Sequence, residues 1–281
     1  GDSACVLPPY KISKQSLDEI KEITEQLSLK LKVKGLINIQ FAYKNKKVYV
    51  LEVNPRASRT IPFVSKTTNT PLAKIAAQIA GGAKLNDFKL KDWRYYKHIA
   101  VKEAVLPFNK FPEESIFLSP EMKSTGEVMG ISKTMGESFL RASIRAGKNL
   151  PKNGKVIISV NDGDKKAMIP IAKKLNDMGF TIIATAGTSI LLNENGMNTE
   201  RIYKVGEGRP NVVDGIKNGE INLVINTPLG AQSRFDEEAI GKACIKKGIL
   251  AITTLSGANA AVDAVSHKDD YSVKSIQDYH N

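Results

Sequence analysis

Cysteine, histidine and aromatic residues are scarce in this sequence, and long apolar runs are absent. The two cysteines, Cys5 and Cys244, are far apart and match no metal-binding or redox spacing, so we expect a reducing cytoplasm. No stretch approaches the roughly 20 apolar residues of a membrane span. No secretory apolar segment opens the chain. We therefore expect no membrane partner.

The net charge of +12 is strongly positive, but its distribution does not suit nucleic-acid binding. Lysines are scattered singly, and the aromatic residues, at 6%, do not interleave with basic ones. We expect no nucleic-acid partner and interpret the charge as a surface suited to small anionic ligands. The chain has no initiator Met and opens with Gly1, Asp2 and Ser3, so we expect a fragment or a processed piece.

Apolar periodicity and turn residues predict a mixed first half. The expected helices cover residues 16–31, 71–80 and 138–146, and the expected strands cover residues 36–43, 48–53 and 101–107.

The second half alternates strands with helices that end at glycines. Five such units predict a parallel sheet covered on both faces, in an α/β fold of two domains, residues 1–147 and 148–281. The expected strands cover residues 155–160, 180–184, 201–205, 221–226 and 249–253, and the expected helices cover residues 164–178, 188–196, 212–218, 237–247 and 258–266.

A first candidate site lies on the hairpin predicted around residues 45–47. Strand alternation places Gln40, Glu52 and Asn54 on one face, if paired residue numbers sum to 92 across a three-residue loop. Tyr49 is expected on the opposite, apolar face, and Val50 beside Gln40.

Side-chain oxygens without cysteine or histidine suit Mg²⁺ first, with Mn²⁺ as the alternative. Arg56 and Arg59 follow, and guanidinium groups beside such a metal site favour ATP-dependent phosphoryl transfer. The same pattern also fits a solvent-facing polar strand face that ends in a proline turn.

A second candidate site lies beyond the carboxyl ends of the parallel strands, where ligands bind in open sheets. Residues 185–188 enter a helix, whose first N–H groups suit a phosphate. The alternatives are that Thr188 only caps this helix and that the lysines are ordinary surface residues. The polar residues expected to meet at this edge are Ser159, Lys165, Thr185, Thr188, Lys204 and Asn226.

Residues 40–42, 52–60, 62–66, 101–108 and 124–130 resemble the second ATP-grasp half of the carbamoyl-phosphate synthase large subunit. The resemblance implies the C-terminal lobe of an ATP-grasp domain that phosphorylates carbamate with ATP to give carbamoyl phosphate. That product feeds pyrimidine and arginine synthesis. Gln40, Glu52 and Asn54 would bind metal, Gln40 and Glu52 would also contact ATP, and Arg56 and Arg59 would steady the transferring phosphoryl group.

The same resemblance implies partners that this sequence does not contain. They are the N-terminal remainder of the large subunit, including the other ATP-grasp lobe, and the glutaminase small subunit. We therefore expect the chain alone to be inactive. Asp2, Glu103 and Thr253 match positions that help to bind ornithine as an activator; from the sequence alone, surface carboxylates remain the alternative for Asp2 and Glu103.

Residues 148–281 resemble the methylglyoxal-synthase-like regulatory domain of the same family, through residues 161–165, 184–188, 206–210 and 225–227. The resemblance implies a Rossmann-like domain that binds a nucleotide monophosphate. Lys165, Thr185, Thr188 and Lys204 would hold the phosphate, and Ser159 and Asn226 would lie beside it. Pro228 stands where some members have a ribose-contacting Thr. The effector therefore stays open between uridylate, inosinate and neither.

Two other functions stay open at this point. One is a methylglyoxal-synthase-type lyase with Asp162 or Asp164 as the base, although none of the three histidines, His98, His267 and His280, is well placed for it. The other is an interaction module without a ligand. A homo-oligomer also stays open.

Overall fold

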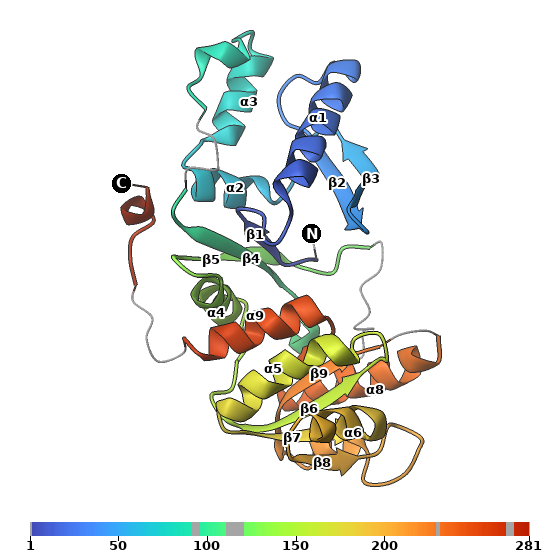
Figure 1. Cartoon of the computed structure of the whole chain (residues 1–281). Coiled ribbons are helices and arrows are strands. Elements are labelled where there is room, and N and C mark those ends of the chain that lie inside the picture. The colour runs from blue at the N-terminus through green and yellow to red at the C-terminus, as the bar shows by residue number, and fades with distance from the viewer. Residues whose placement is uncertain (1, 91–95, 111–120, 229–230, 268–272, 281) are drawn as a thin grey trace.

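The computed structural model describes residues 2–90, 96–110, 121–228, 231–267 and 273–280 (Figure 1). In this part of the chain, the strands form a two-stranded hairpin, a three-stranded antiparallel sheet and a five-stranded parallel sheet. Figure 1 shows the three sheets one below another, with the hairpin at the top and the parallel sheet at the bottom. The predicted α/β class is confirmed.

The first part of the chain supplies the hairpin, the antiparallel sheet and the helices around them. The predicted helices and strands are present with boundaries shifted by a few residues, whereas β1, α2 and β5 were not predicted. The elements are β1 (Cys5–Leu7), α1 (Lys14–Lys30), β2 (Asn38–Lys44), β3 (Lys47–Asn54), α2 (Ile61–Thr68), α3 (Leu72–Ala80), η1 (Leu85–Asp87), β4 (Ile99–Val105), η3 (Phe108–Lys110), β5 (Gly126–Ser132) and α4 (Met135–Arg145).

Helix α2 joins the hairpin to the antiparallel sheet. The helix begins directly after Thr60 and carries Pro62 in its first turn, where a missing N–H costs nothing. Its Phe63 packs with Ala100 of β4 and Ile131 of β5 in a small buried cluster. The sheet order is β1-β4-β5. The segment that follows the candidate metal residues is therefore anchored on this sheet.

The second part of the chain forms the predicted parallel sheet, in the order β10-β9-β6-β7-β8. The elements are β6 (Gly154–Val160), α5 (Lys165–Asp177), β7 (Phe180–Thr185), α6 (Ala186–Glu194), β8 (Thr199–Ile202), α7 (Val212–Lys217), β9 (Ile221–Thr227), α8 (Ala231–Lys247), β10 (Leu250–Ile252), α9 (Leu255–Val265) and η4 (Gln277–Tyr279).

The central strand β6 is covered on both faces, as parallel sheets require. Val156 and Ile158 point into a core that also contains residues of α4, α5 and α9. Ile157 points the other way, into a core shared with residues of α7 and α8. All three side chains are fully buried. Strand alternation therefore explains why this stretch is continuously apolar in sequence.

Helices α4 and α9 pack closely and connect the two parts of the molecule. A Cβ on Gly136 would come within 2.6 Å of the backbone oxygen of Asp263, so α4 needs a glycine at this crossing. Leu140 of α4 and Val101 of β4 share a core with the parallel sheet. None of the described helices combines the length and apolar character needed to cross a membrane.

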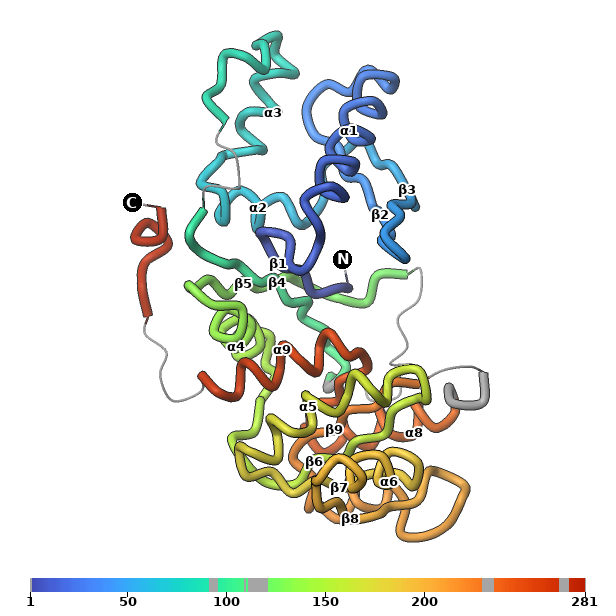
Figure 2. The backbone as a smooth tube through the Cα atoms, viewed as in Figure 1, coloured from blue at the N-terminus to red at the C-terminus, as the bar shows by residue number. Residues whose placement is uncertain are grey.

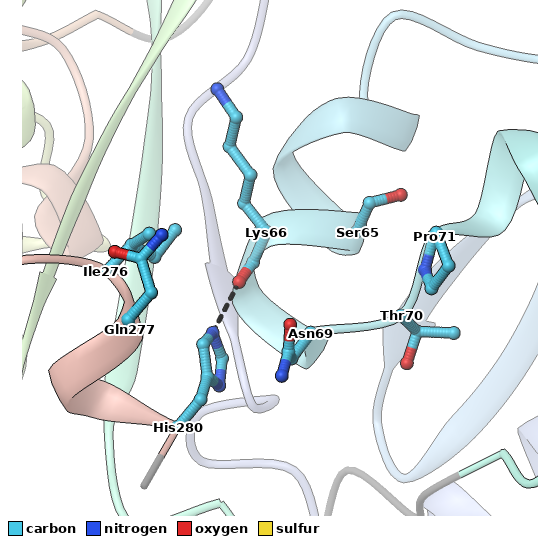
Figure 3. Close-up of a pocket in the computed structure, with 8 residues that line it drawn as sticks. All are labelled: Ser65, Lys66, Asn69, Thr70, Pro71, Ile276, Gln277 and His280. Atoms are coloured by element: carbon cyan, nitrogen blue, oxygen red, sulfur yellow. Dashed lines mark hydrogen bonds between the residues drawn. The ribbon is translucent and has the colours of Figure 1, made fainter.

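The described C-terminal residues 273–280, here called the C-terminal strap, return to α2. Figure 2 shows this segment beside α2 and well away from the parallel sheet. His280 Nε2 donates to the carbonyl oxygen of Lys66 at 2.7 Å (Figure 3). Tyr279 Oη accepts a hydrogen bond from Arg141 of α4 at 3.2 Å. The strap thus contacts both α2 and the helix that bridges the two parts.

His98, at the start of β4, lies beneath the strap and is 3% exposed. Its Nε2 is 2.9 Å from the carbonyl oxygen of Thr67, and its Nδ1 is 3.2 Å from that of Tyr279. A neutral imidazole has one N–H, so only the protonated ring donates to both oxygens. A cavity of about 410 Å³ lies beside the strap, lined by residues of the strap, of the end of α2 and of the turn that follows α2 (Figure 3).

Candidate functional site

The hairpin places the predicted metal residues on a common face. Gln40 and Glu52 are direct partners across the antiparallel pair, and Asn38 and Asn54 pair one step further along the same face. Directly opposed residues have Cβ atoms about 4.5–5.5 Å apart. The predicted pairing of Gln40 with Glu52 is confirmed.

The predicted three-residue loop is wrong. Asn45 and Lys46 form a two-residue turn, and both have positive φ, 52° and 61°, as in a type I′ turn. Phe41 pairs with Val50 rather than with Leu51, so Leu51 is an extra residue in a β-bulge. The bulge reverses the predicted facing of the β3 residues between it and the turn, including Tyr49 and Val50. It leaves Gln40 opposite Glu52.

The side chains of Gln40 and Glu52 are exposed, and that of Asn54 is half-buried. Within the described residues, none of the three makes a side-chain hydrogen bond or an ion pair. Three oxygen-bearing side chains with spare capacity on one face suit a hard divalent cation. These residues therefore fit the Mg²⁺ or Mn²⁺ that the resemblance implies.

Arg56 and Arg59 sit in different surroundings. Arg56 is exposed, and its Nη1 donates to the neighbouring carbonyl oxygen of Ala57 at 2.9 Å. Arg59 is half-buried and donates to Ser124, which lies in the segment leading into β5. Both arginines occur in the turn between β3 and α2, so both follow directly from the candidate metal face.

The second candidate site forms where β6, β7 and β9 end side by side. Ser159 pairs with Asn226 across β6 and β9, and Thr185 Oγ1 donates to Ser159 Oγ at 3.4 Å. Thr185 and Asn226 are almost fully buried. The structure therefore brings Ser159, Thr185 and Asn226 together at one edge of the sheet.

Thr188 is not the residue that caps α6. The helix begins two residues earlier than predicted, at Ala186, with Thr185 at the N-cap and no side-chain capping bond. Thr188 is 1% exposed, and its Oγ1 has no hydrogen-bond partner among the described residues. A buried hydroxyl without a partner costs about 1–3 kcal/mol. A ligand oxygen at this helix N-terminus would remove that cost.

Lys165 reaches the same helix terminus. A Cβ on Gly187 would lie 2.7 Å from Lys165 Nζ, so the glycine makes room for the ammonium group. The ammonium also pairs with Asp162 Oδ1 at 2.6 Å. Lys204 lies further out and pairs with Glu207 at 3.6 Å. The residues that gather at the N-terminus of α6 are therefore Lys165, Thr185 and Thr188, with Lys204 at the rim of this cluster.

The carboxylates near this edge are poorly suited to serve as a base. The hydrogen bond from Lys165, with the charges of Lys165 and Lys204, lowers the pKa of the Asp162 carboxyl. Asp164 accepts a hydrogen bond from Asn161 Nδ2 at 2.7 Å. A general base works best with a pKa near the operating pH, and Asp162 is shifted in the opposite direction.

Asp2, Glu103 and Thr253 are not joined by any hydrogen bond or ion pair among the described residues. Asp2 accepts the backbone N–H groups of Lys123 and Ser124, both at 2.8 Å. Glu103 is buried, and its Oε2 pairs with Lys148 Nζ at 2.6 Å. Thr253 is exposed just after β10. Each of the two carboxylates therefore already has a partner within the protein.

The antiparallel sheet contains a buried ion pair that the sequence pattern does not predict. Lys102 is 2% exposed and pairs with Glu127 Oε1 at 3.0 Å, between neighbouring strands β4 and β5. Strand periodicity alone would place a lysine and a glutamate on a solvent face. The pair lies close to Thr60, which is 3.5 Å from the same Glu127 oxygen.

Comparisons with known proteins match two separate stretches of the chain to family models. Residues 1–88 match the family model described as carbamoyl-phosphate synthase L chain, ATP binding domain, and residues 167–253 match the MGS-like domain. The whole chain is 49% identical to a carbamoyl phosphate synthase large chain of Acidobacterium capsulatum and 50% identical to one of Archaeoglobus fulgidus. It covers 26% of the length of each.

A shorter relative is the Aquifex aeolicus protein named carbamoyl phosphate synthase large chain, C-terminal section. The whole chain is 45% identical to it and covers 57% of its length. Among solved structures, methylglyoxal synthase from Elizabethkingia anophelis aligns with 40% of this chain and 79% of its own, at 19% identity and a TM-score of 0.34.

Proposed function

Because the chain belongs to the carbamoyl phosphate synthase large-chain family, we propose that its first part is one lobe of an ATP site that phosphorylates carbamate. The observation that carries this proposal is the pairing of Gln40 with Glu52 on one face, with Asn54 beside them. No group in the described part of the chain bonds to their side-chain oxygens. In this proposal ATP is the substrate and Mg²⁺ or Mn²⁺ the cofactor.

Each side chain has a defined task in this proposal. Gln40, Glu52 and Asn54 hold the metal, and Gln40 and Glu52 also contact the nucleotide. When bound, the metal would neutralise negative charge on the ATP phosphates. Arg56 and Arg59 follow on the same segment and stabilise negative charge on the transferring phosphoryl group.

We propose that the rest of a full-length large chain supplies the other ATP-grasp lobe. The support is the apolar surface of the hairpin, where Val50 and Leu51 are 42% and 59% exposed. The glutaminase small subunit would deliver the nitrogen, in the reducing cytoplasm that the cysteine usage predicts. A homo-oligomer stays open. The chain of 281 residues alone should make no carbamoyl phosphate.

The test is carbamoyl phosphate formation from carbamate and ATP by a full-length large chain that carries Glu52→Gln. This change keeps the side-chain shape and removes the charge, so we expect a loss in kcat of about 100-fold or more. Lys47→Gln, at the far end of the same strand, is the matched control and should keep full activity. Equal activity of the Glu52→Gln variant and the wild type would reject the proposed role.

We also propose that the parallel-sheet domain senses a nucleotide monophosphate. Two observations favour this proposal. The buried Thr188 hydroxyl has no partner within the described ranges, and the Lys165 ammonium lies close to Gly187 at the same helix N-terminus. The domain boundary near residue 148 is part of this proposal. Ser159 and Asn226 would line the site, and Lys204 would add charge at its rim.

Calorimetry with uridylate and inosinate, on wild type and Lys165→Ala, tests the sensing function. We expect heat with one nucleotide in the wild type and at least tenfold weaker binding in the variant, about 1.4 kcal/mol. No heat with either nucleotide would favour an interaction module without a ligand. Methylglyoxal formation from dihydroxyacetone phosphate would instead indicate the lyase. The lowered pKa of Asp162 speaks against that activity.

A further inference from the structure

Arg59 is held in place by a distant part of the chain, whereas Arg56 is not. Arg59 Nη1 donates to the carbonyl oxygen of Ser124 at 3.0 Å, and Nη2 donates to Ser124 Oγ at 2.5 Å. One serine therefore binds two nitrogens of the guanidinium group. Among the described residues, the Arg56 guanidinium donates only to the carbonyl oxygen of Ala57, the next residue in the chain. A doubly bonded guanidinium has a fixed plane and direction.

Ser124 is in turn fixed by Asp2. The serine is 6% exposed, and its backbone N–H donates to Asp2 Oδ1 at 2.8 Å. The N–H of Lys123 donates to the other oxygen, Oδ2, also at 2.8 Å. On the far side, the N–H of Thr125 donates to Val105 of β4 at 2.9 Å. Bonds to residues on both sides thus set where Ser124 lies.

Asp2 is well suited to this task because it is ionised at neutral pH. Partial burial acts to raise the pKa of its carboxyl, but the hydrogen bonds from Lys123 and Ser124 outweigh that effect and lower it from 3.8 to about 2. Hydrogen bonds to an ionised acceptor are roughly twice as strong as neutral ones. The contact between Asp2 and this loop therefore persists at physiological pH.

The guanidinium retains unused capacity. Arg59 Nε is buried and has no hydrogen-bond partner among the described residues. If Arg59 served only to link the start of α2 to the segment before β5, a hydrogen bond to Nε as well would stabilise the fold further. The geometry instead fixes the two terminal nitrogens and leaves one donor unmet, as expected of a group that is positioned for another task.

We propose that Ser124 is a positioning residue for Arg59 and that Asp2 sets the position of Ser124. This inference rests on the proposed role of Arg59 in phosphoryl transfer. It gives Asp2 a second task beyond the activator site that the resemblance implies.

The functional test uses a full-length large chain with Ser124→Ala, Ser124→Thr or Asp2→Asn. We expect Ser124→Ala to lower kcat for carbamoyl phosphate formation about tenfold or more while KM for ATP changes less than about twofold. Ser124→Thr keeps the hydroxyl and should restore kcat to within about threefold of the wild type. Asp2→Asn should act in the same direction as Ser124→Ala. Unchanged kcat in a folded Ser124→Ala variant would overturn the proposal.

Thr125→Ala is the matched control, because it removes a hydroxyl from the neighbouring exposed residue that does not contact Arg59. The control should keep kcat and the melting temperature of the wild type. If Ser124→Ala and Thr125→Ala lowered kcat equally, in step with the melting temperature, Ser124 would be only structural.

A second measurement on this chain separates the inference from the proposed function. The ¹⁵N NMR signal of Arg59 Nε–H reports how freely the guanidinium rotates. We expect slow rotation in the wild type and Ser124→Thr, and faster rotation in Ser124→Ala and Asp2→Asn. If wild-type enzyme lacks activity but these spectra differ as expected, only the proposed function fails. If rotation is the same in all variants, the positioning role fails whatever the activity.

Discussion

The hairpin region and the parallel-sheet domain differ in how many of their side chains are buried. Among residues 10–58, the single buried residue is the small polar Ser16. In the parallel-sheet domain, Ile158, Leu223 and their neighbours on the central strands are fully buried between two helical layers. The parallel-sheet domain therefore carries its own core. The hairpin holds its candidate site on a ribbon whose apolar side chains are half-buried or exposed.

The difference has a consequence for the two candidate sites. In the second candidate site, the anion site, Thr185, Thr188 and Asn226 are buried, so close packing limits their rotamers. The metal site is built from exposed side chains, so its final geometry depends on what covers the hairpin. We therefore expect the anion site to be complete in this chain and the metal site to be complete only in a longer one.

The largest expected effect breaks the parallel-sheet core. Ile158→Ala should lower the free energy of unfolding by about 2–5 kcal/mol, because it leaves a cavity in the central strand. Leu51→Ala on the hairpin should change it by less than about 0.5 kcal/mol. Urea denaturation followed by circular dichroism measures both values. A hairpin substitution as costly as the core one would contradict the comparison.

The next effect concerns the C-terminal strap, which contacts α2 and α4. His98→Phe keeps an aromatic ring but cannot donate to the carbonyl oxygens of Thr67 and Tyr279, so we expect a loss of about 1–3 kcal/mol. Hydrogen exchange of residues 273–280 and of α2 should become faster. His267→Asn is the control and should leave that exchange unchanged. Exchange in the wild-type strap as fast as in a free peptide would contradict the docked position.

A somewhat smaller effect sharpens the contrast at the anion site. Thr188→Val removes the buried hydroxyl without changing the shape of the side chain. Without ligand, stability should stay the same or rise by about 1 kcal/mol, because no described residue hydrogen-bonds to the hydroxyl. Binding of phosphate or of a nucleotide monophosphate, measured by calorimetry, should weaken about tenfold. Thr181→Val, on an exposed position of β7, is the control. Unchanged affinity in Thr188→Val would remove Thr188 from the site.

The smallest effect lies in the hairpin turn. Lys46 has φ 61°, and Gly is favoured at this position of a type I′ turn, so Lys46→Gly should stabilise the hairpin by about 0.5–1 kcal/mol. Amide exchange in β2 and β3 should slow accordingly. Lys47→Gly, one residue later in the strand, should have the opposite effect. Faster exchange in Lys46→Gly would argue against the turn described here.

The parallel sheet could be predicted from the sequence because its signals are local. Each strand is a short apolar run, and glycines end the helices, as Gly179 and Gly219 do with φ values of 84° and 78°. The polar residues at the strand ends then meet because parallel strands share one edge. The same logic could not reveal that α6 begins at Ala186. Thr185 and Thr188 have the same preference for the N-cap position, so the sequence does not show which of them precedes the helix.

The hairpin was predicted less completely because its register depends on both the length of the turn and the bulge at Leu51. Both a regular ladder with a three-residue loop and a bulged ladder with a two-residue turn place Gln40 opposite Glu52. Periodicity cannot distinguish them, and the positive φ of Lys46 is unusual for a lysine. Contacts between distant segments, such as Arg59 with Ser124, leave no pattern in the sequence at all.

Because of the bulge at Leu51, the number of residues in the hairpin turn can change without changing the pairing of Gln40 with Glu52. A one-residue insertion in the turn, balanced by removal of Leu51, would give a regular ladder that still presents positions 40 and 52 as a pair. A three-residue turn without a bulge and a two-residue turn with a bulge are therefore equivalent for this pair. Engineered linkers or labels at residues 45–46 should accordingly leave the candidate metal residues at the base of the hairpin undisturbed.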